Sequence, residues 1–210
     1  MVVEETRKQK VHFKIPVRGQ KHKMVEMAKE NAQNVLRMDR EKIKREERRT
    51  IGAVHEIEEL LGMEGLNRME AFDISNISGF QTVASMVVFE RGKARRRDYR
   101  KFRLRTIEGP DDYASMEEVL TRRFLHGKKE LEELKEQGKD TTLGSFTKFP
   151  DILMMDGGKG QVNVALRVLD HLGLDIPVCG MVKDDDHRTR GLYYNNEEII
   201  FAPNSEAFLL

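Results

Sequence analysis

The run of residues 150–161 offers chemistry because a single carboxylate stands between an apolar stretch and a glycine-rich turn. Ile152 to Met155 are four consecutive apolar residues, which is typical of a short strand buried on both faces. Three glycines and Lys159 follow Asp156, and apolar residues then recur at helical spacing from Val162 to Leu172. Asp156 is therefore expected at the carboxyl end of a central strand, beside a lysine and a helix N-terminus, where open α/β sheets bind ligands.

Two other interpretations of this turn compete with a general ligand site. The turn lacks the lysine followed by serine or threonine of a phosphate-cradling loop, and its glycines do not match the dinucleotide-binding fingerprint. A nucleotide site is therefore only weakly indicated. Asp156 could instead serve merely as the cap of the following helix, and this stretch alone does not distinguish the two roles. A second carboxylate in similar surroundings would favour a ligand site.

Asp73 is that second carboxylate, since it follows the apolar residues of an expected first core strand that begins near Asn67. If this strand is central, it neighbours the strand that ends at Asp156, and the two carboxylates converge. Carboxylates that lie close together repel each other, and a divalent cation relieves the repulsion while acting as a Lewis acid. Oxygen ligands favour Mg²⁺ or Mn²⁺ over zinc. Such an ion beside a basic strand and a glycine-lysine turn points to phosphodiester hydrolysis.

A basic strand is expected over residues 93–105, directly after a tight turn at Arg91-Gly92. Because side chains alternate along a strand, six cations fall on one face, interrupted only by Tyr99. These cations are Lys93, Arg95, Arg97, Lys101, Arg103 and Arg105. Like charges on one face repel, so an anionic partner such as a nucleic-acid backbone would stabilise them. A solvent-exposed edge strand that uses basic residues to block aggregation is an equally good explanation.

A helix is expected after Gly109-Pro110, and its N-cap is expected to be one of the two aspartates at 111–112. Capping is the default role for an aspartate in that position. Two to three turns later, the adjacent cations Arg122 and Arg123 point toward whatever this helix faces. The helix is therefore a second candidate source of positive charge.

The overall composition sets limits on the class of protein. With 210 residues, 39% of them hydrophobic, the chain can bury one good core and an appendage. Its 37 basic and 36 acidic residues nearly cancel, so only local clustering of charge can indicate nucleic-acid binding. Cys179 is the only cysteine, which excludes an intrachain disulfide and is compatible with a reducing cytoplasm. No run is long enough to span a membrane and no apolar signal region begins the chain, so a cytoplasmic protein is expected.

The elements that must position these residues belong to a mixed α/β fold. Residues 1–66 are expected to form an N-terminal strand near 11–17 and a long charged helix, or two helices in series, packing on the core. Residues 67–210 are expected to form that core, with three antiparallel strands followed by two strand-helix-strand steps that should be parallel. A hairpin around Asn195-Asn196 ends the chain. The expected architecture is a mixed five-stranded sheet flanked by helices.

Three motifs resemble, in order and spacing, the C-terminal half of the UvrC family, the nuclease subunit of bacterial UvrABC nucleotide excision repair. They are Phe72-Asp73-Ile-Ser-Asn76, Asp112-Tyr113 with Thr121-Arg-Arg123, and Asp156-Gly-Gly-Lys-Gly-Gln161. The resemblance runs from about residue 11 to the end of the chain, and its motifs are specific to that family. It implies a ribonuclease H-like fold and the incision made 5′ to a lesion in double-stranded DNA. It also implies UvrB as a partner, through parts of UvrC outside this chain.

The resemblance further implies roles for individual residues. Asp73 and Asp156 are the catalytic carboxylates that bind Mg²⁺ or Mn²⁺, and Asp112 is a third functional acid, which can also be a helix cap. His187 is not the family's catalytic histidine; its place in the loop after the last parallel strand, and not the resemblance, makes it a loop residue expected near the site, in contact with phosphate. The cations expected to contact DNA phosphates are Lys159, Lys183, Arg122, Arg123, Arg97 and Lys101.

Two departures from the family pattern affect these expectations. The N-terminal incision domain and the C-terminal tandem helix-hairpin-helix module of UvrC are absent, and the apolar end of the chain at 208–210 looks like a cut. The family's catalytic histidine would lie beyond Leu210, so the chain alone is expected to be inactive or weak. The alternative hypothesis is a non-catalytic DNA-binding or assembly module whose carboxylates are structural. A third is another ribonuclease H-like nuclease, such as one that cuts RNA–DNA hybrids.

Overall fold

Contacts within the computed structural model divide the chain into two units, residues 1–46 and 47–210. The first unit consists largely of α2 (Gln20–Glu47), and no residue of this fully described helix is buried. Most of the expected N-terminal strand lies outside the described residues, and residues 15–17 are in no strand. None of the described helices is both long and apolar enough to cross a membrane. The residues that the structure describes are 15–77, 81–104, 111–184, 186, 188–203 and 205–209.

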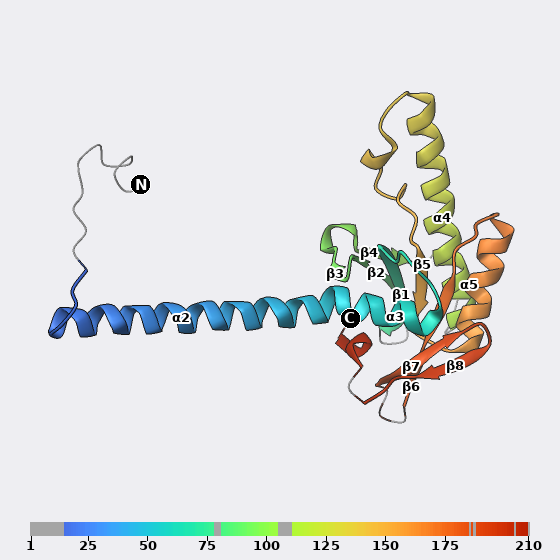
Figure 1. Ribbon diagram of the computed structural model, residues 1–210. Coiled ribbons are helices and arrows are strands. Elements are labelled where there is room, and N and C mark those ends of the chain that lie inside the picture. The colour runs from blue at the N-terminus through green and yellow to red at the C-terminus, as the bar shows by residue number, and fades with distance from the viewer. Residues whose placement is uncertain are drawn as a thin grey trace. The chain divides into compact units, whose positions relative to one another are not determined.

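A mixed sheet, with eight strands among the described residues, lies at the centre of the second unit (Figure 1). The order across the sheet is β3-β2-β1-β5-β6-β7-β8, and β4 also pairs with β2. β5 is parallel to β1 on one side and to β6 on the other, whereas the remaining pairs are antiparallel. The expected mixed α/β fold is therefore confirmed. The strands are β1 (Arg68–Ile77), β2 (Gln81–Glu90), β3 (Lys93–Ala94), β4 (Arg100–Arg103), β5 (Ile152–Met155), β6 (Val178–Lys183), β7 (Thr189–Tyr194) and β8 (Glu197–Ile200).

The sheet is larger than the expected five strands partly because the C-terminal hairpin joins it. β7 pairs antiparallel with β6, and β8 then extends the sheet by one more strand. Asn195 and Asn196 form the hairpin turn with φ angles of 49° and 66°. Asparagine tolerates this left-handed region, which tight two-residue hairpin turns require.

The basic strand expected over 93–105 is the second difference, because it is not continuous. The short 3-10 helix η2 (Arg96–Asp98) separates β3 from β4. Asp98 accepts a hydrogen bond from the guanidinium of Arg68 at 2.8 Å, which holds this turn against β1. The chain therefore turns away from the sheet midway, and the cations expected at 93–103 do not share one face. Arg105 lies outside the described residues. The basic residues exposed on β4 are Lys101 and Arg103.

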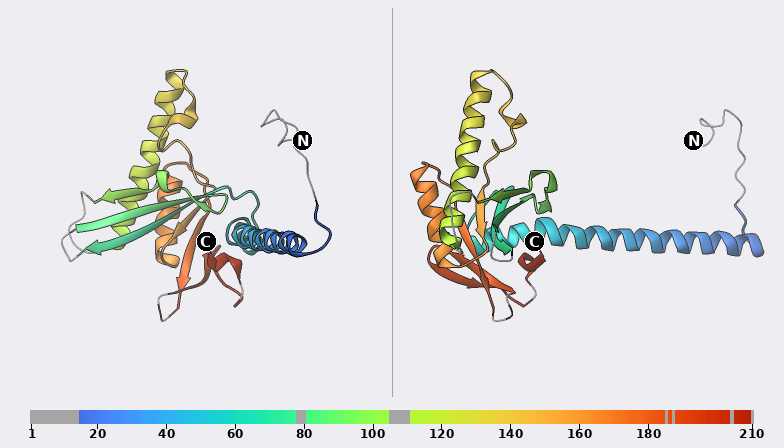
Figure 2. Two further views of the ribbon diagram at one scale, coloured as in Figure 1. Left: turned by 90° about the vertical axis from the view of Figure 1, so that its left-hand side faces the viewer. Right: turned by 180° about the vertical axis from the view of Figure 1, so that it is seen from behind.

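Helices cover both faces of this sheet (Figure 2). On one face, α4 (Asp112–Glu136) and α5 (Lys159–His171) pack on a core that includes Phe72 of β1. On the other face, α3 (Ala53–Leu61) packs on a core that includes Met69 of the same strand. Because side chains alternate along a strand, β1 contributes to both cores and is buried at the middle of the unit.

A π-helical turn, η1 (Arg48–Gly52), joins α2 to α3, so the long helical segment is two α-helices in series. α3 ends at Gly62, whose φ of 63° is the left-handed conformation of a common helix end. Near that end, Glu58 accepts a hydrogen bond from the backbone N–H of Leu66 at 2.7 Å and lies 2.8 Å from His55. These contacts lower the pKa of the Glu58 carboxyl, with the Leu66 hydrogen bond as the main cause. Glu58 thus fastens α3 to the segment that enters β1.

Candidate metal and phosphodiester site

The register of β1 and β5 brings the two predicted acids together. Phe72 pairs with Met155 in the parallel ladder, and the backbone N–H of Asp156 donates to the carbonyl oxygen of Phe72 at 3.0 Å. Asp73 and Asp156 are the next residues on strands that run about 4.8 Å apart. Phe72 and Met155 both enter the core beneath α4 and α5, so the acids that follow them turn to the opposite face. The sequence-based expectation that these strands are neighbours is confirmed.

A row of polar side chains crosses the sheet through these acids. Asp73 pairs with Ser85 of β2, and Ser85 pairs with Lys101 of β4, so the three residues share one face. Lys101 therefore lies about 10 Å from Asp73, across two strand spacings. On the other side, Nζ of Lys183 in β6 is 2.5 Å from Oδ1 of Asp156. The row thus has two acids in the middle and a lysine on each side, which suits a phosphate held above a carboxylate-bound cation.

Both carboxylates remain accessible to solvent. The side chain of Asp156 is 23% exposed, and that of Lys183 is 38% exposed. Asp73 is half-buried, and its Oδ2 accepts a hydrogen bond from the hydroxyl of Ser75 at 3.0 Å. A cation or a phosphate can therefore reach the row from the solvent, while the strands hold the acids in place.

The glycine-rich turn places the start of α5 next to Asp156, and the Asp156 carboxylate does not cap that helix. The N-cap of α5 is Gly158, so the interpretation of Asp156 as the helix cap is wrong. Gly180 of β6 leaves room for the turn, because a Cβ at that position would meet the carbonyl oxygen of Gly157 and a methyl group of Val162. The carboxylate of Asp156 is therefore available to bind a ligand.

Gly180→Ala is expected to lower the free energy of unfolding by about 1–3 kcal/mol, the usual cost of overpacking. The added methyl would press on the backbone carbonyl of Gly157, which cannot move without shifting Asp156. Urea unfolding followed by circular dichroism measures the change. Gly158→Ala is the matched control, since no described atom lies within 4 Å of its added Cβ. Equal losses in the two variants would show that close packing at 180 is not the cause.

Gln161 belongs to the site, although its residue type alone carries no signal of a role. Its side-chain amide lies over Gly157, and Oε1 is buried without a hydrogen-bond partner in the described part of the chain. A buried acceptor left without a donor costs about 1–3 kcal/mol. The site beside Asp156 therefore favours a ligand that brings a donor, and a hydrated cation does so.

The first turn of α4 brings Asp112 to the same end of the sheet. Asp111 is the N-cap of α4, and its carboxylate accepts a backbone hydrogen bond from the first turn at 2.9 Å. Tyr113 lies against Gly160 of α5, where a Cβ would collide with the tyrosine ring. The first turns of the two helices are therefore in contact beside Asp156, and Asp112 is exposed there.

The predicted phosphate-binding cations occupy different places. Arg122 is partly exposed on α4, donates to the carbonyl oxygen of Arg103 at 2.8 Å and pairs with Glu118 at 3.0 Å. Arg97 is exposed on η2, outside the row of polar side chains. His187 lies outside the described residues. The cations beside the two acids are Lys101, Lys183 and, at the first position of α5, Lys159.

Arg123 is buried, which contradicts the expectation that it contacts a DNA phosphate. Its side chain and that of Glu70 are both 0% exposed, and Nη2 of Arg123 is 2.8 Å from Oε1 of Glu70. Arg123 also donates to the carbonyl oxygens of Phe146 and Lys148, each at 2.8 Å. Glu70 is shared with Arg68 at 2.9 Å. This buried ion triad, Arg68–Glu70–Arg123, links α4 to β1. The burial of Arg123 therefore depends on a partner that lies far away in the sequence.

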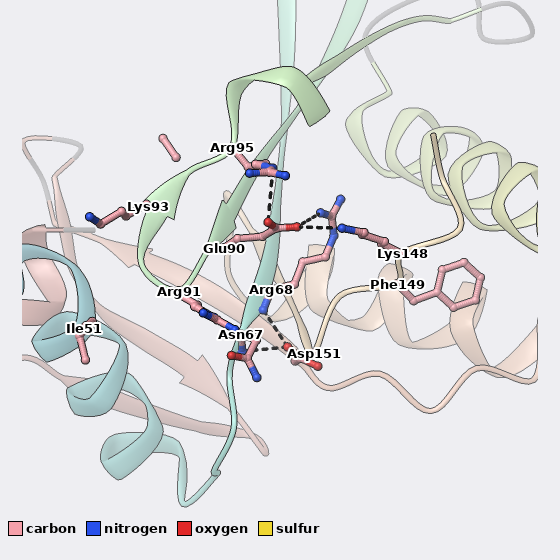
Figure 3. Close-up of a pocket in the computed structure, with 11 residues that line it drawn as sticks. Ile51, Asn67, Arg68, Glu90, Arg91, Lys93, Arg95, Lys148, Phe149 and Asp151 are labelled. Atoms are coloured by element: carbon pink, nitrogen blue, oxygen red, sulfur yellow. Dashed lines mark hydrogen bonds and ion pairs between the residues drawn. The ribbon is translucent and has the colours of Figure 1, made fainter. Parts of the chain in front are cut away.

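A second group of charges lines a cavity of about 790 Å³ at the other end of β1 (Figure 3). Glu90 pairs there with Arg68 at 3.1 Å, with Arg95 at 3.3 Å and with Lys148 at 3.8 Å. Asp151 accepts the backbone N–H of Arg68 at 2.7 Å. Because these charges pair with one another, we infer that they hold β1, β2 and the chain before β5 together.

The donors for a metal ion are the two carboxylates of the row. Among the described residues, no three histidine, cysteine, aspartate or glutamate side chains form a metal-ligating group. Burial raises the pKa of the Cys179 thiol to about 12, so the thiol stays protonated and is a poor ligand. Mg²⁺ is commonly bound by one or two carboxylates, with waters and substrate phosphates completing its shell. Asp73 and Asp156, with the unpartnered oxygen of Gln161 nearby, fit such an ion.

Comparisons with known proteins show the family to which this chain is similar. The family described as the UvrC RNAse H endonuclease domain matches residues 58–210, and the UvrC Ribonuclease H-like domain matches residues 1–39. Two relatives named UvrABC system protein C, from Lachnospira eligens and Clostridium beijerinckii, are 59% identical over 201 residues and 51% identical over 197 residues. The matches cover 96% and 93% of this chain but 32% of each relative, so the chain spans about a third of their length. The crystal structure of human ENDOV is similar at 13% identity and a TM-score of 0.32, covering 62% of this chain and 64% of that one.

Proposed function

The chain belongs to the family of UvrC RNAse H endonuclease domains, and from this premise we propose that it cleaves phosphodiester bonds of DNA with a Mg²⁺ or Mn²⁺ ion bound by Asp73 and Asp156. The register of β1 and β5 carries the proposal, since the two acids follow a directly paired Phe72 and Met155. Nuclease domains of the ribonuclease H-like class generally use divalent metal ions. Asp112, at the start of α4, is the third functional acid in this proposal.

Each charged residue of the row has a task in the proposed reaction. The ion supplies Lewis-acid polarisation of the phosphate when it is bound. Asp73 and Asp156 would hold the ion, and Lys183, which pairs with Asp156 in this structure, would then contact the phosphate. Lys101 of the row and Lys159 at the first position of α5 would hold the DNA backbone, which fixes the scissile bond relative to the acids.

We place this activity in bacterial nucleotide excision repair, as the incision made 5′ to a lesion in double-stranded DNA. The relatives' name, UvrABC system protein C, supports this assignment. UvrB is the proposed protein partner, through parts of the whole protein outside these 210 residues. The whole protein would then deliver the damaged strand to the row of acids and lysines.

The second candidate function is a non-catalytic DNA-binding or assembly module with structural carboxylates. The observation that favours it is the contact between Lys183 and Asp156, which balances one acid without a metal ion. In that case no divalent ion would produce incision.

Removing divalent metal from the intact protein is expected to abolish incision of a lesion-bearing duplex, and adding back Mg²⁺ or Mn²⁺ is expected to restore it. Incision in excess chelator would contradict the proposal. Stability provides a readout besides activity, because a ligand at about 100 times its Kd adds about 2.7 kcal/mol to the free energy of unfolding. Mn²⁺ should stabilise the 210-residue chain in this way, and the Asp73→Asn/Asp156→Asn variant should lose the effect.

A further inference from the structure

A basic groove lies between β4 and the exposed side of α4. It encloses about 500 Å³, and none of the described residues that line it carries a carboxylate. This uniform sign distinguishes the groove from the cavity at the other end of β1, where Glu90 pairs with three cations. The lining residues that matter here are Arg100, Lys101, Arg122, His126, Lys129 and Phe146.

Regular structure holds the polar side chains of the groove. Arg122, His126 and Lys129 recur at i, i+4 and i+7, so they lie on one face of α4. The guanidinium carbon of Arg100 is 5.2 Å from the centroid of the Phe146 ring, and that of Arg122 lies over a second ring at 5.8 Å. Stacking on a ring pre-orients a guanidinium, so less side-chain entropy is lost when it binds an anion.

Acids outside the lining offset only part of this charge. Arg122 pairs with Glu118 at 3.0 Å, and Lys129 pairs with Glu133 at 3.7 Å between side chains that are 77% and 54% exposed. An exposed pair such as Lys129–Glu133 contributes at most about 1 kcal/mol, so a phosphate can compete for Lys129. Glu118 is 12% exposed, so its pair with Arg122 is held more firmly. The groove therefore remains attractive to a polyanion.

The groove continues the row of polar side chains that contains the two acids. Lys101 lines the groove and also stands in that row, across Ser85 from Asp73. It lies about 10 Å from Asp73, and successive phosphates of one DNA strand are separated by at least the axial rise of about 3.4 Å. A strand whose scissile phosphate lies at the acids would therefore reach Lys101 with a phosphate no more than about three nucleotides away.

We propose that this groove binds the DNA backbone on one side of the cut, beginning within about three nucleotides of the bond that is hydrolysed. The inference rests on the proposed function, because the acids define where the cut bond lies. Its contacts are to phosphates, so the groove contributes affinity without reading sequence. The bound DNA strand would then follow one path over the protein, from the two acids across the edge strand β4 to α4.

The test is the binding of a labelled DNA duplex to the 210-residue chain in the presence of chelator, with and without Arg122→Gln/Lys129→Gln. Two lost phosphate contacts should weaken binding on the order of 10-fold and reduce the slope of log affinity against log salt by about 1.8. Lys135→Gln/Lys139→Gln is the matched control, since it removes two exposed lysines near the far end of α4. This control should bind within about twofold of the unaltered chain, because its charges make no phosphate contact.

Urea unfolding checks that the groove variant is folded, and Lys101→Gln/Lys129→Gln is a second variant whose two side chains are both exposed. Affinity and salt slope that match the control in both variants would overturn the proposed groove. Failure of the nuclease proposal has a different signature, because incision would then survive Asp73→Asn whatever the groove variants do. The two inferences can therefore fail separately.

Discussion

Asp73→Asn and Asp156→Asn are each expected to slow incision about a thousandfold or more, because losing ~4 kcal/mol of transition-state stabilisation costs three powers of ten in rate. Asparagine keeps the shape of the side chain but removes the negative charge that attracts the ion. The effect should appear in the rate of incision of a lesion-bearing duplex by the intact protein. It should be accompanied by loss of Mn²⁺-dependent stabilisation in both variants.

The stability of these variants separates lost chemistry from lost folding. Each change should alter the free energy of unfolding by less than about 1 kcal/mol, since both acids are partly exposed and surface pairs contribute little. Asp175→Asn is the matched control, because Asp175 is an exposed acid in the loop before β6 and lies outside the row. The double variant should be no slower than either single variant, because the two acids act as one unit. Full incision by Asp73→Asn would rule out the assigned role.

Arg123→Met is expected to lower the free energy of unfolding by about 3–5 kcal/mol, the usual cost of breaking a buried ion pair. The change leaves Glu70 fully buried with one fewer partner and removes the donor to the carbonyl oxygens of Phe146 and Lys148. A loss of this size in a chain of 210 residues lowers the melting temperature by roughly 10 °C. Thermal and urea unfolding both measure it.

The neighbouring arginine provides the control for this prediction. Arg122→Met removes a partly exposed cation, so its stability cost should be about 1 kcal/mol or less, while DNA binding weakens. Glu70→Leu/Arg123→Met should cost less than the sum of the two single changes, because both buried charges disappear together. A stable Arg123→Met variant with weakened DNA binding would instead support the phosphate contact that the sequence predicts for Arg123.

Local patterns in the sequence were sufficient to predict the part of the site that depends on one short segment. The apolar run before Asp156 and the glycines after it predicted a strand, a tight turn and a helix, and β5 and α5 have this arrangement. The asparagine pair at 195–196 predicted the hairpin for the same reason, since the turn conformation depends on those two residues. The pairing of β1 with β5 follows from the topology on the condition that the first core strand is central, and β1 does lie between β2 and β5.

Features that depend on distant partners could not be predicted in this way. Arg123 looks like Arg122 in the sequence, and only the packing of α4 against Glu70 of β1 decides which of them is buried. The basic strand was expected to continue, but the pairing of Arg68 with Asp98, which lie 30 residues apart, holds a turn in its middle. Gln161 became a site residue only when its unpartnered oxygen was located beside Gly157.

The most direct test of the central claim is a crystal structure of this chain soaked in Mn²⁺, with the ion located by its anomalous signal. We expect one ion within about 2.0–2.6 Å of a carboxylate oxygen from both Asp73 and Asp156, with Nζ of Lys183 displaced from Asp156. An ion bound elsewhere, or two acids that remain metal-free with Lys183 still in contact at saturating Mn²⁺, would contradict it.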